Sequence, residues 1–235
     1  MRYIFKNENV SIAYSTIADG NLIETKALEQ FLERQSVRNI ILVRPGGNTI
    51  PHISIKHQYD FPKELVHAHA VITQFESHVS GGIGVPTADC PALIGIDMKT
   101  NTFVILHIGW LQVYTNLIDK TLKNVFSHSL STKNDILIFS TPGICKTCFT
   151  FNGLKGRIRS SLFRISPWKK HLQKNSGVYS FDIQGAIKDQ LLHLGIPEQN
   201  IILDLTCTCE DKELSSHRRD RKKRTSSNFV IVSKQ

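Results

Sequence analysis

The stretch PTADCPALIGIDMKTNTFVILHIGW, residues 86–110, decides how this chain is expected to fold. Its apolar runs at 91–96 and 103–106 are separated by a short polar segment, the pattern of two buried β-strands joined by a turn. If the strands pair antiparallel, the start of the first lies beside the end of the second. Cys90 and His107 occupy these two positions, so we expect their side chains to meet at one edge of the sheet.

Outward from this hairpin the pattern alternates between strands and helices. Apolar residues three or four apart between Val113 and Phe126 predict a helix with one buried face. A second helix is predicted to begin after Asp182, a good N-cap residue, and to end at Gly195, with Pro197 just beyond. Further strands are expected at 1–8, 39–43, 135–139 and 201–203. The pattern therefore fits an α/β or α+β protein with mixed sheets, and we expect the α+β class.

The composition is that of an ordinary globular protein. Apolar residues make up 40% and charged residues 21% of the chain, and no linker or repeat divides it, so we expect a single domain over 1–235. No apolar run approaches the roughly 18–20 residues that cross a bilayer, and the N-terminus lacks the apolar core of a secretory signal. With five cysteines and no export signal, we expect reduced thiols in a cytoplasmic protein that binds no membrane.

The net charge of +9 raises the question of a nucleic-acid partner. One octet, 217–224, holds six basic residues and one acid and so supplies +5 of this charge. No aromatic residues interleave with the octet, as they do in surfaces that stack single-stranded bases. We therefore do not expect nucleic acid to bind, and we interpret the octet as a solvated face or as a cluster that binds phosphate.

Three chemistries suit the pairing of Cys90 with His107. A thiolate and a neutral imidazole are ligands for zinc or copper, and a catalytic zinc keeps three protein ligands and an activated water. Alternatively, His107 deprotonates Cys90, which then acts as the nucleophile of a metal-free hydrolase or deamidase. The third interpretation is a buried cysteine packed as a small apolar group beside a histidine bonded to the backbone. Spacing alone leaves all three open.

The remaining cysteines form two pairs, Cys145 with Cys148 and Cys207 with Cys209. The spacing within each pair can contribute to a structural zinc site, but the separation between the pairs does not match a compact zinc ribbon. We therefore interpret these four as structural or packing cysteines. Five histidines precede Cys90 and leave room for a third ligand without indicating which one: His52, His57, His67, His69 and His78.

A set of short motifs occurs in a fixed order along nearly the whole chain. They are TADCP (87–91), HIGW (107–110), TPGI (141–144), CF (148–149), CT (207–208), SHRRD (216–220) and Arg224. This set resembles the laccase-domain, or multicopper-polyphenol-oxidase-like, family, which includes purine nucleoside phosphorylases of the peptidoglycan editing factor type. Each motif is short, but the ordered set is specific.

The resemblance implies a four-layer α/β/β/α sandwich of mixed sheets and one metal ion, zinc or copper, bound by two histidines and one cysteine. By position, Cys90 and His107 would be two of these ligands and would act in catalysis, with Asp89 setting their loop. The implied activities are phosphorolysis of adenosine, inosine and methylthioadenosine, and deamination of adenosine. The partners would then be a purine nucleoside and phosphate. The arginines suited to bind phosphate are Arg218, Arg219 and Arg224.

Four changes, which affect five residues, separate the implied pocket from the family pattern. The family's first histidine ligand lies in a Gln-x-His-Gly turn, where this chain has RPGG (44–47), so Gly46 takes the ligand's place. His52, six residues further on, could replace it. The other departures are Ile17 in place of an arginine, Leu111 and Gln112 in place of Arg-Gly, and His69 in place of an acid. They indicate a rearranged or an inactive site.

From these motifs we predict a metal-dependent purine nucleoside enzyme. One alternative is the metal-free hydrolase or deamidase with Cys90 as nucleophile. Another is a catalytically silent protein that binds nucleosides, which the missing histidine and arginine would explain. Oxidation of phenols is disfavoured, because a single metal ion cannot supply the several coppers that such chemistry uses.

Overall fold

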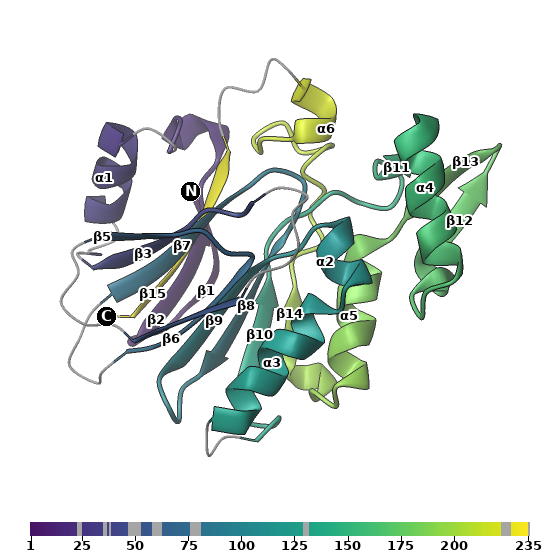
Figure 1. Cartoon of the computed structure of the whole chain (residues 1–235). Helices are drawn as coiled ribbons and strands as arrows, with labels where there is room; N and C mark the ends of the chain where they lie inside the picture. The colour runs from purple at the N-terminus through teal and green to yellow at the C-terminus, as the bar shows by residue number, and fades with distance from the viewer. Residues whose placement is uncertain are drawn as a thin grey trace.

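The computed structural model describes residues 1–22, 25–34, 37, 39–46, 53–57, 63–75, 81–128, 132–221 and 227–234. Within these residues the chain forms two six-stranded sheets and one three-stranded sheet (Figure 1). The first large sheet has the order β1 (Arg2–Lys6), β2 (Val10–Tyr14), β15 (Asn228–Lys234), β7 (Gly81–Thr87), β3 (Ile40–Val43), β5 (Lys63–Val66). The second has the order β14 (Ile201–Leu203), β10 (Ile136–Ser140), β8 (Ala92–Asp97), β9 (Thr102–His107), β6 (Ala70–Gln74), β4 (Ile53–His57). Both sheets mix parallel and antiparallel pairs, as predicted.

The two large sheets pack face to face, and helices cover their outer faces. Apolar side chains of both sheets, among them Ile12, Val85 and Ile94, form one buried layer between the sheets. Helix α1 (Thr25–Arg34) packs through a separate core on the outer face of the first sheet. Helices α3 (Leu117–His128) and α5 (Ile183–His193) cover the outer face of the second. This is the predicted four-layer α/β/β/α sandwich (Figure 1).

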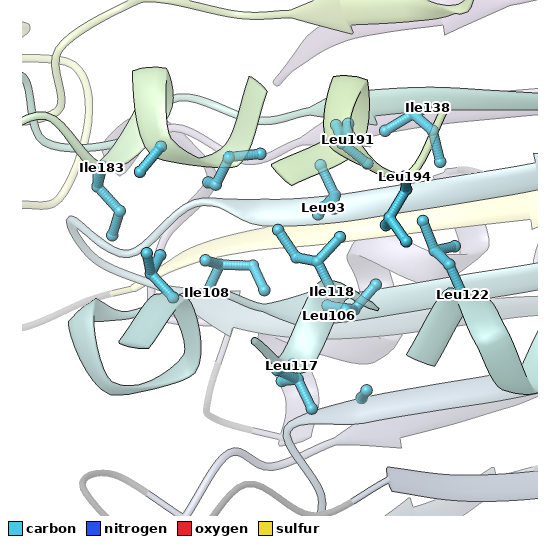
Figure 2. Close-up of a cluster of buried hydrophobic side chains, with 14 of the residues drawn as sticks. Leu93, Leu106, Ile108, Leu117, Ile118, Leu122, Ile138, Ile183, Leu191 and Leu194 are labelled. Carbon is cyan, nitrogen blue, oxygen red and sulfur yellow. The ribbon is translucent and has the colours of Figure 1, made fainter. Parts of the chain in front are cut away.

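The core beneath α3 and α5 shows how helical apolar spacing becomes packing (Figure 2). Ile118 and Leu122 on α3, and Leu191 on α5, meet side chains of the second sheet. Leu93 on β8 and Ile138 on β10 are two of these partners, and all five side chains are 0% exposed. Burying one such side chain contributes about 1.5–3 kcal/mol. The layer therefore holds both helices firmly against the sheet that contains the 86–110 hairpin.

The predicted hairpin is present, since β8 and β9 pair antiparallel with Ala92 opposite His107. The helix predicted next is confirmed in its buried face but is divided into α2 (Trp110–Tyr114) and α3. Asn116 between them has a φ of 54°, a left-handed conformation that interrupts a helix and that asparagine tolerates. Asp182 caps α5 as predicted, because its side chain accepts a hydrogen bond from a backbone N–H of the first turn.

A smaller unit stands apart from the sandwich in Figure 1. It comprises α4 (Gly153–Arg164) and the three-stranded sheet β11 (Thr150–Phe151), β13 (Val178–Phe181), β12 (Leu172–Asn175). Rings of Phe151, Phe163 and Phe181 stack together and join the unit to the core beneath α3 and α5. The remaining short helices are η1 (Ile17–Asp19), η2 (Lys169–His171), η3 (Glu198–Asn200) and α6 (His217–Asp220). Across the described ranges, the structure contains no helix of the length and apolarity that a bilayer crossing requires.

The close packing of Gly84 on β7 against Phe229 on β15 generates a stability prediction. A Cβ at position 84 would lie 2.7 Å from Cε1 of the Phe229 ring, well inside contact distance. Gly84→Ala should therefore lower the free energy of unfolding by about 1–3 kcal/mol, as measured by urea denaturation. Phe229→Leu removes the obstructing ring. The double variant should therefore lose less free energy of unfolding than the two single variants lose together. A Gly84→Ala protein that unfolds at the wild-type urea concentration would contradict this packing.

Candidate functional site

A pocket of about 460 Å³ opens where β7 and β9 end and β8 begins, and both Cys90 and His107 line it. Cys90 lies in the loop that leads from β7 into β8, while His107 is the last residue of β9. A methyl group at Gly109 would approach the Cys90 Sγ to 3.2 Å, so the glycine leaves room beside the thiol. The structure thus brings the thiol and the imidazole into one compartment.

Burial keeps both groups uncharged in the metal-free protein. Loss of solvent raises the pKa of the Cys90 thiol to about 12, and the negative charge of Asp89 adds to this effect. Loss of solvent also lowers the pKa of His107 to about 4, with the nearby His69 imidazole as a second cause. The Nδ1 atom of His107 is buried and has no hydrogen-bond partner among the described residues. A neutral imidazole with an unpartnered nitrogen beside a thiol has the chemistry of a metal-ligand pair.

The described residues supply this pair but not a complete ligand set. Cys90 and His107 do not belong to any described group of three Cys, His, Asp or Glu ligand atoms within 4.8 Å of one another. His69 is buried next to His107, whose backbone N–H donates to the His69 carbonyl at 2.8 Å. His52 lies outside the described residues. Zinc or copper would therefore be held by two donors in this part of the chain, and a third ligand must come from elsewhere.

The end of β3 also reaches the pocket, although not through Gly46. Arg44 and Pro45 line the cavity, whereas Gly46 is exposed and outside its wall. Arg44 was not predicted as a pocket residue. Its position directly after the buried strand β3 is the signal that could have identified it as one.

Asp89 holds the loop rather than facing the pocket with a free carboxylate. It is buried, and its φ of 80° lies in the left-handed region. Its oxygens accept hydrogen bonds from Thr208 Oγ1 at 2.8 Å, Ser216 Oγ at 2.7 Å and the Arg218 backbone N–H at 2.6 Å. Because three protein donors occupy the carboxylate, its geometry is that of a positioning residue.

The three predicted phosphate-binding arginines have different environments. Arg218 lines the pocket, with its guanidinium over the Phe149 ring and two Nη atoms donating to Thr150. Arg219 turns away: its guanidinium donates to Asp220 and to the carbonyl oxygens of 208, 209, 211 and 214. These bonds join it to the protein, which argues against a phosphate-binding role for Arg219. Arg224 lies outside the described residues.

Arg159 on α4 is a pocket residue that the sequence analysis missed. Its guanidinium lies 4.8 Å from the centroid of the Trp110 ring, and burial followed by the charge of Arg218 lowers its pKa. In the described structure neither Arg159 nor Arg218 forms a salt bridge with a carboxylate. A single arginine on a helix with no clear apolar period carries no sequence signal. The two guanidinium groups together form an uncompensated positive wall.

A second basic pocket of about 450 Å³ adjoins this wall and shares Arg159 and Arg218 with the first. His217 also lines both pockets, and Lys155 and Arg221 are the further basic lining residues of the second. Such a concentration of positive charge attracts anions toward the mouth of a site. The cavity is therefore lined by two uncharged groups that can bind a metal, Cys90 and His107. It is also lined by guanidinium groups that can attract an anion.

Separate from this pair, four other side chains converge within the described residues. The ligand atoms of Cys145, Cys148, Cys207 and Glu210 all lie within 4.8 Å of one another and could hold a metal ion. The sequence separation of the two cysteine pairs had given no reason to expect this contact.

The chain is similar in sequence to one protein family and to several named proteins. The family model described as multi-copper polyphenol oxidoreductase laccase matches residues 30–233. A purine nucleoside phosphorylase of Clostridium acetobutylicum is 27% identical over 148 residues, 63% of this chain and 61% of that protein. The purine nucleoside phosphorylase of Aquifex aeolicus is 29% identical over 150 residues, covering 64% and 65%. Adenosine deaminase RL5, from an unknown prokaryotic organism, is 26% identical over 159 residues, covering 64% and 56%. The matched part spans less than two thirds of each of these relatives.

Two crystal structures share the fold over nearly the whole chain. YlmD from Geobacillus stearothermophilus superposes with a TM-score of 0.75 at 16% identity, covering 97% of this chain and 92% of that one. The Bacillus licheniformis protein YfiH superposes with a TM-score of 0.74 at 17% identity, covering 96% and 93%. At this identity the likeness establishes the common architecture.

The buried Asp89 network makes a testable prediction. Asn at position 89 tolerates the positive φ but replaces one acceptor with an NH₂ group that meets a protein donor. Asp89→Asn should lower the free energy of unfolding by about 1–3 kcal/mol in urea titration. Asp119→Asn is the control, because Asp119 forms only a surface pair with Lys123 and should cost less than about 0.5 kcal/mol. Equal losses in both variants would contradict the network.

The raised pKa of Cys90 predicts slow alkylation in reduced, chelator-treated protein. A shift from 9.0 to about 12 lowers the thiolate fraction at neutral pH roughly a thousandfold. Iodoacetamide should therefore modify Cys90 far more slowly than free cysteine at pH 7.5, and the rate should still be rising at pH 10. Peptide mass spectrometry measures the rate, with Cys90→Ala identifying the peptide. A rate that levels off below pH 9 would show that the thiol is activated.

Proposed function

Because the chain belongs to the multi-copper polyphenol oxidoreductase laccase family, we propose that it is a purine nucleoside phosphorylase whose phosphate is bound by Arg159 and Arg218. The observation that carries this proposal is the pair of guanidinium groups on one wall of the Cys90–His107 pocket, without carboxylate partners among the described residues. Guanidinium groups bind phosphate oxygens through paired, charge-assisted hydrogen bonds. Relatives named purine nucleoside phosphorylase support the same reaction class.

The rest of the pocket suits a nucleoside. Its volume of about 460 Å³ is within the range of small-ligand sites. Trp110 and Phe149 supply aromatic faces, and Ile144 and Ile183 supply apolar ones, for a planar purine base. The Trp110 Nε1 donor is buried without a hydrogen-bond partner in the described structure. These features favour a neutral ring system lying next to an anion.

In the proposed reaction, a hydrogen phosphate oxygen forms a bond to ribose C1′ while the C1′–N9 bond breaks. The purine leaves with the bonding electron pair and gains the proton that hydrogen phosphate gives up, so the products are ribose 1-phosphate and the free base. Arg159 and Arg218 would hold the phosphate against the ribose and reduce the electrostatic cost of bringing it into the pocket. Asp89 would act by fixing the Arg218 backbone through its hydrogen bond at 2.6 Å.

Deamination of adenosine is a second candidate, favoured by the Cys90–His107 pair. These residues would hold a zinc or copper ion, which when bound supplies a water with a lowered pKa. The two uncharged donors already lie in the pocket, and His107 presents an unpartnered Nδ1. The relative named adenosine deaminase supports this reaction class.

The two rival interpretations are a metal-free cysteine hydrolase and a catalytically silent binding protein. A metal-free cysteine hydrolase needs a thiolate and a basic imidazole at neutral pH, and the raised pKa of Cys90 with the lowered pKa of His107 disfavours both. A silent binding protein is favoured by the departures at Gly46 and Ile17, where the family has a histidine and an arginine. It would retain the pocket and would be stabilised by nucleosides without forming products.

The deciding experiment incubates the full-length protein with inosine or adenosine, with and without phosphate. Chromatography should detect hypoxanthine or adenine only when phosphate is present. Arg159→Gln and Arg218→Gln should each raise the KM for phosphate about 10–100-fold, since each removes a charge-assisted interaction. Arg157→Gln, an exposed position on the same helix, is the control and should leave KM unchanged. Nucleoside-dependent thermal stabilisation without any free base would overturn phosphorolysis in favour of the silent protein.

A further inference from the structure

Two short turns outside the pocket carry the converging cysteine and glutamate side chains. The first spans 145–148, and its Cys148 N–H donates to the Cys145 carbonyl at 3.1 Å. The second spans 207–210, and its Glu210 N–H donates to the Cys207 carbonyl at 3.2 Å. In both turns two residues separate the side chains that can bind a metal. This is the ligand spacing of the turns that hold structural zinc.

Backbone pairing brings the two turns together although 62 residues separate Cys145 from Cys207. Gly143 forms a parallel bridge with Cys207, and the Cys145 N–H donates to the Cys207 Sγ at 3.3 Å. The Glu210 Oε1 lies 3.5 Å from the Cys145 Sγ and 3.7 Å from the Cys148 Sγ. In a tetrahedral zinc site, bonds of about 2.0–2.3 Å put neighbouring ligand atoms roughly 3.3–3.8 Å apart. The distances to Glu210 already match that arrangement.

From this geometry we propose that Cys145, Cys148, Cys207 and Glu210 form a structural zinc site, distinct from the Cys90–His107 pair. Three thiols select a soft or borderline metal such as Zn²⁺ over Mg²⁺ or Ca²⁺, which take oxygen ligands. Four protein ligands close a tetrahedral shell and leave no position for a reacting water. The Cys145 N–H bond to the Cys207 sulfur stabilises a thiolate, the form that binds metal.

The site would act as a cross-link behind the wall of the pocket. Ile144 and Phe149 line the pocket, and each directly neighbours a ligand of the first turn. Thr208, inside the second turn, donates to the Asp89 carboxylate at 2.8 Å. Zinc would therefore join the two segments that shape this wall, and its release would loosen both. Zinc binding itself does not depend on which reaction the pocket performs.

Cys209 provides a matched control within the same turn. Its thiol contacts that of Cys148, and it packs against the helical core, but it is not one of the four converging ligands. A Cys209→Ser variant should therefore keep zinc, while a change at any of the four ligands should weaken or abolish zinc binding. Glu210 is exposed, so Glu210→Gln tests the ligand set without disturbing the core.

The experiment uses the full-length protein without a histidine tag, carrying Cys90→Ala and His107→Ala so that the pocket cannot bind metal. After chelation under reducing conditions and dialysis against Zn²⁺, elemental analysis should find one zinc per chain. Adding Cys145→Ser or Cys207→Ser should abolish this zinc, and Glu210→Gln should weaken binding at least tenfold, while Cys209→Ser should retain it. Co²⁺ in place of zinc should give thiolate-to-cobalt absorption that is lost with the same variants.

A readout of stability completes the test. Chelation should lower the Tm of the Cys90→Ala/His107→Ala protein but not that of the same protein with Cys145→Ser. If the cysteine variants fail to fold, the folded Glu210→Gln protein and the cobalt spectrum still decide. Three outcomes would overturn the proposal. The first is the absence of zinc from the reduced Cys90→Ala/His107→Ala protein, and the second is a disulfide among these cysteines in place of zinc. The third is loss of zinc in Cys209→Ser while Glu210→Gln loses none. Failure of phosphorolysis alone would leave each of these measurements unchanged.

Discussion

The carboxylate of Asp89 is the contact on which the site depends. It joins its own loop to the 207–210 turn through Thr208, and to the start of α6 through Ser216 and Arg218. A buried carboxylate without such donors is costly, so these segments are held together whenever the chain is folded. The same contacts position the Cys90 thiol, which follows Asp89 directly, and the Arg218 side chain across the pocket.

Around this anchor the pocket separates uncharged donors from fixed positive charge. Burial keeps Cys90 and His107 neutral in the metal-free protein, whereas Arg159 and Arg218 remain cationic against aromatic rings. Low solvent access strengthens the field of the two guanidinium groups inside the cavity. A neutral ring system and a phosphate would therefore meet complementary surfaces in one cavity, which is the physical basis of the proposed reaction.

The wall that completes the cavity is made from loops, and loops need cross-links to keep a fixed shape. Asp89 is one such link, and the two cysteine turns lie immediately behind the residues that it holds. Metal bound between those turns would stiffen the wall independently of the chemistry in the pocket. The proposed roles would thus fall to different cysteines: Cys90 lines the cavity, and the proposed structural site is formed by Cys145, Cys148 and Cys207.

Local sequence was enough to identify the 86–110 hairpin and the cap at Asp182, and to expect Cys90 and His107 at the same edge of the sheet, where both line one pocket. Apolar period and cap chemistry are properties of neighbouring residues, and one antiparallel pair brings the ends of two adjacent strands together. The ordered motifs added the sandwich. Only the assembled fold selected Arg159 over Arg219 and brought Cys145 to Cys207, because these contacts arise from the packing of elements distant in sequence. Short sequence patterns carry no information about such meetings, so the charged wall and the cysteine cluster emerged from tertiary structure alone.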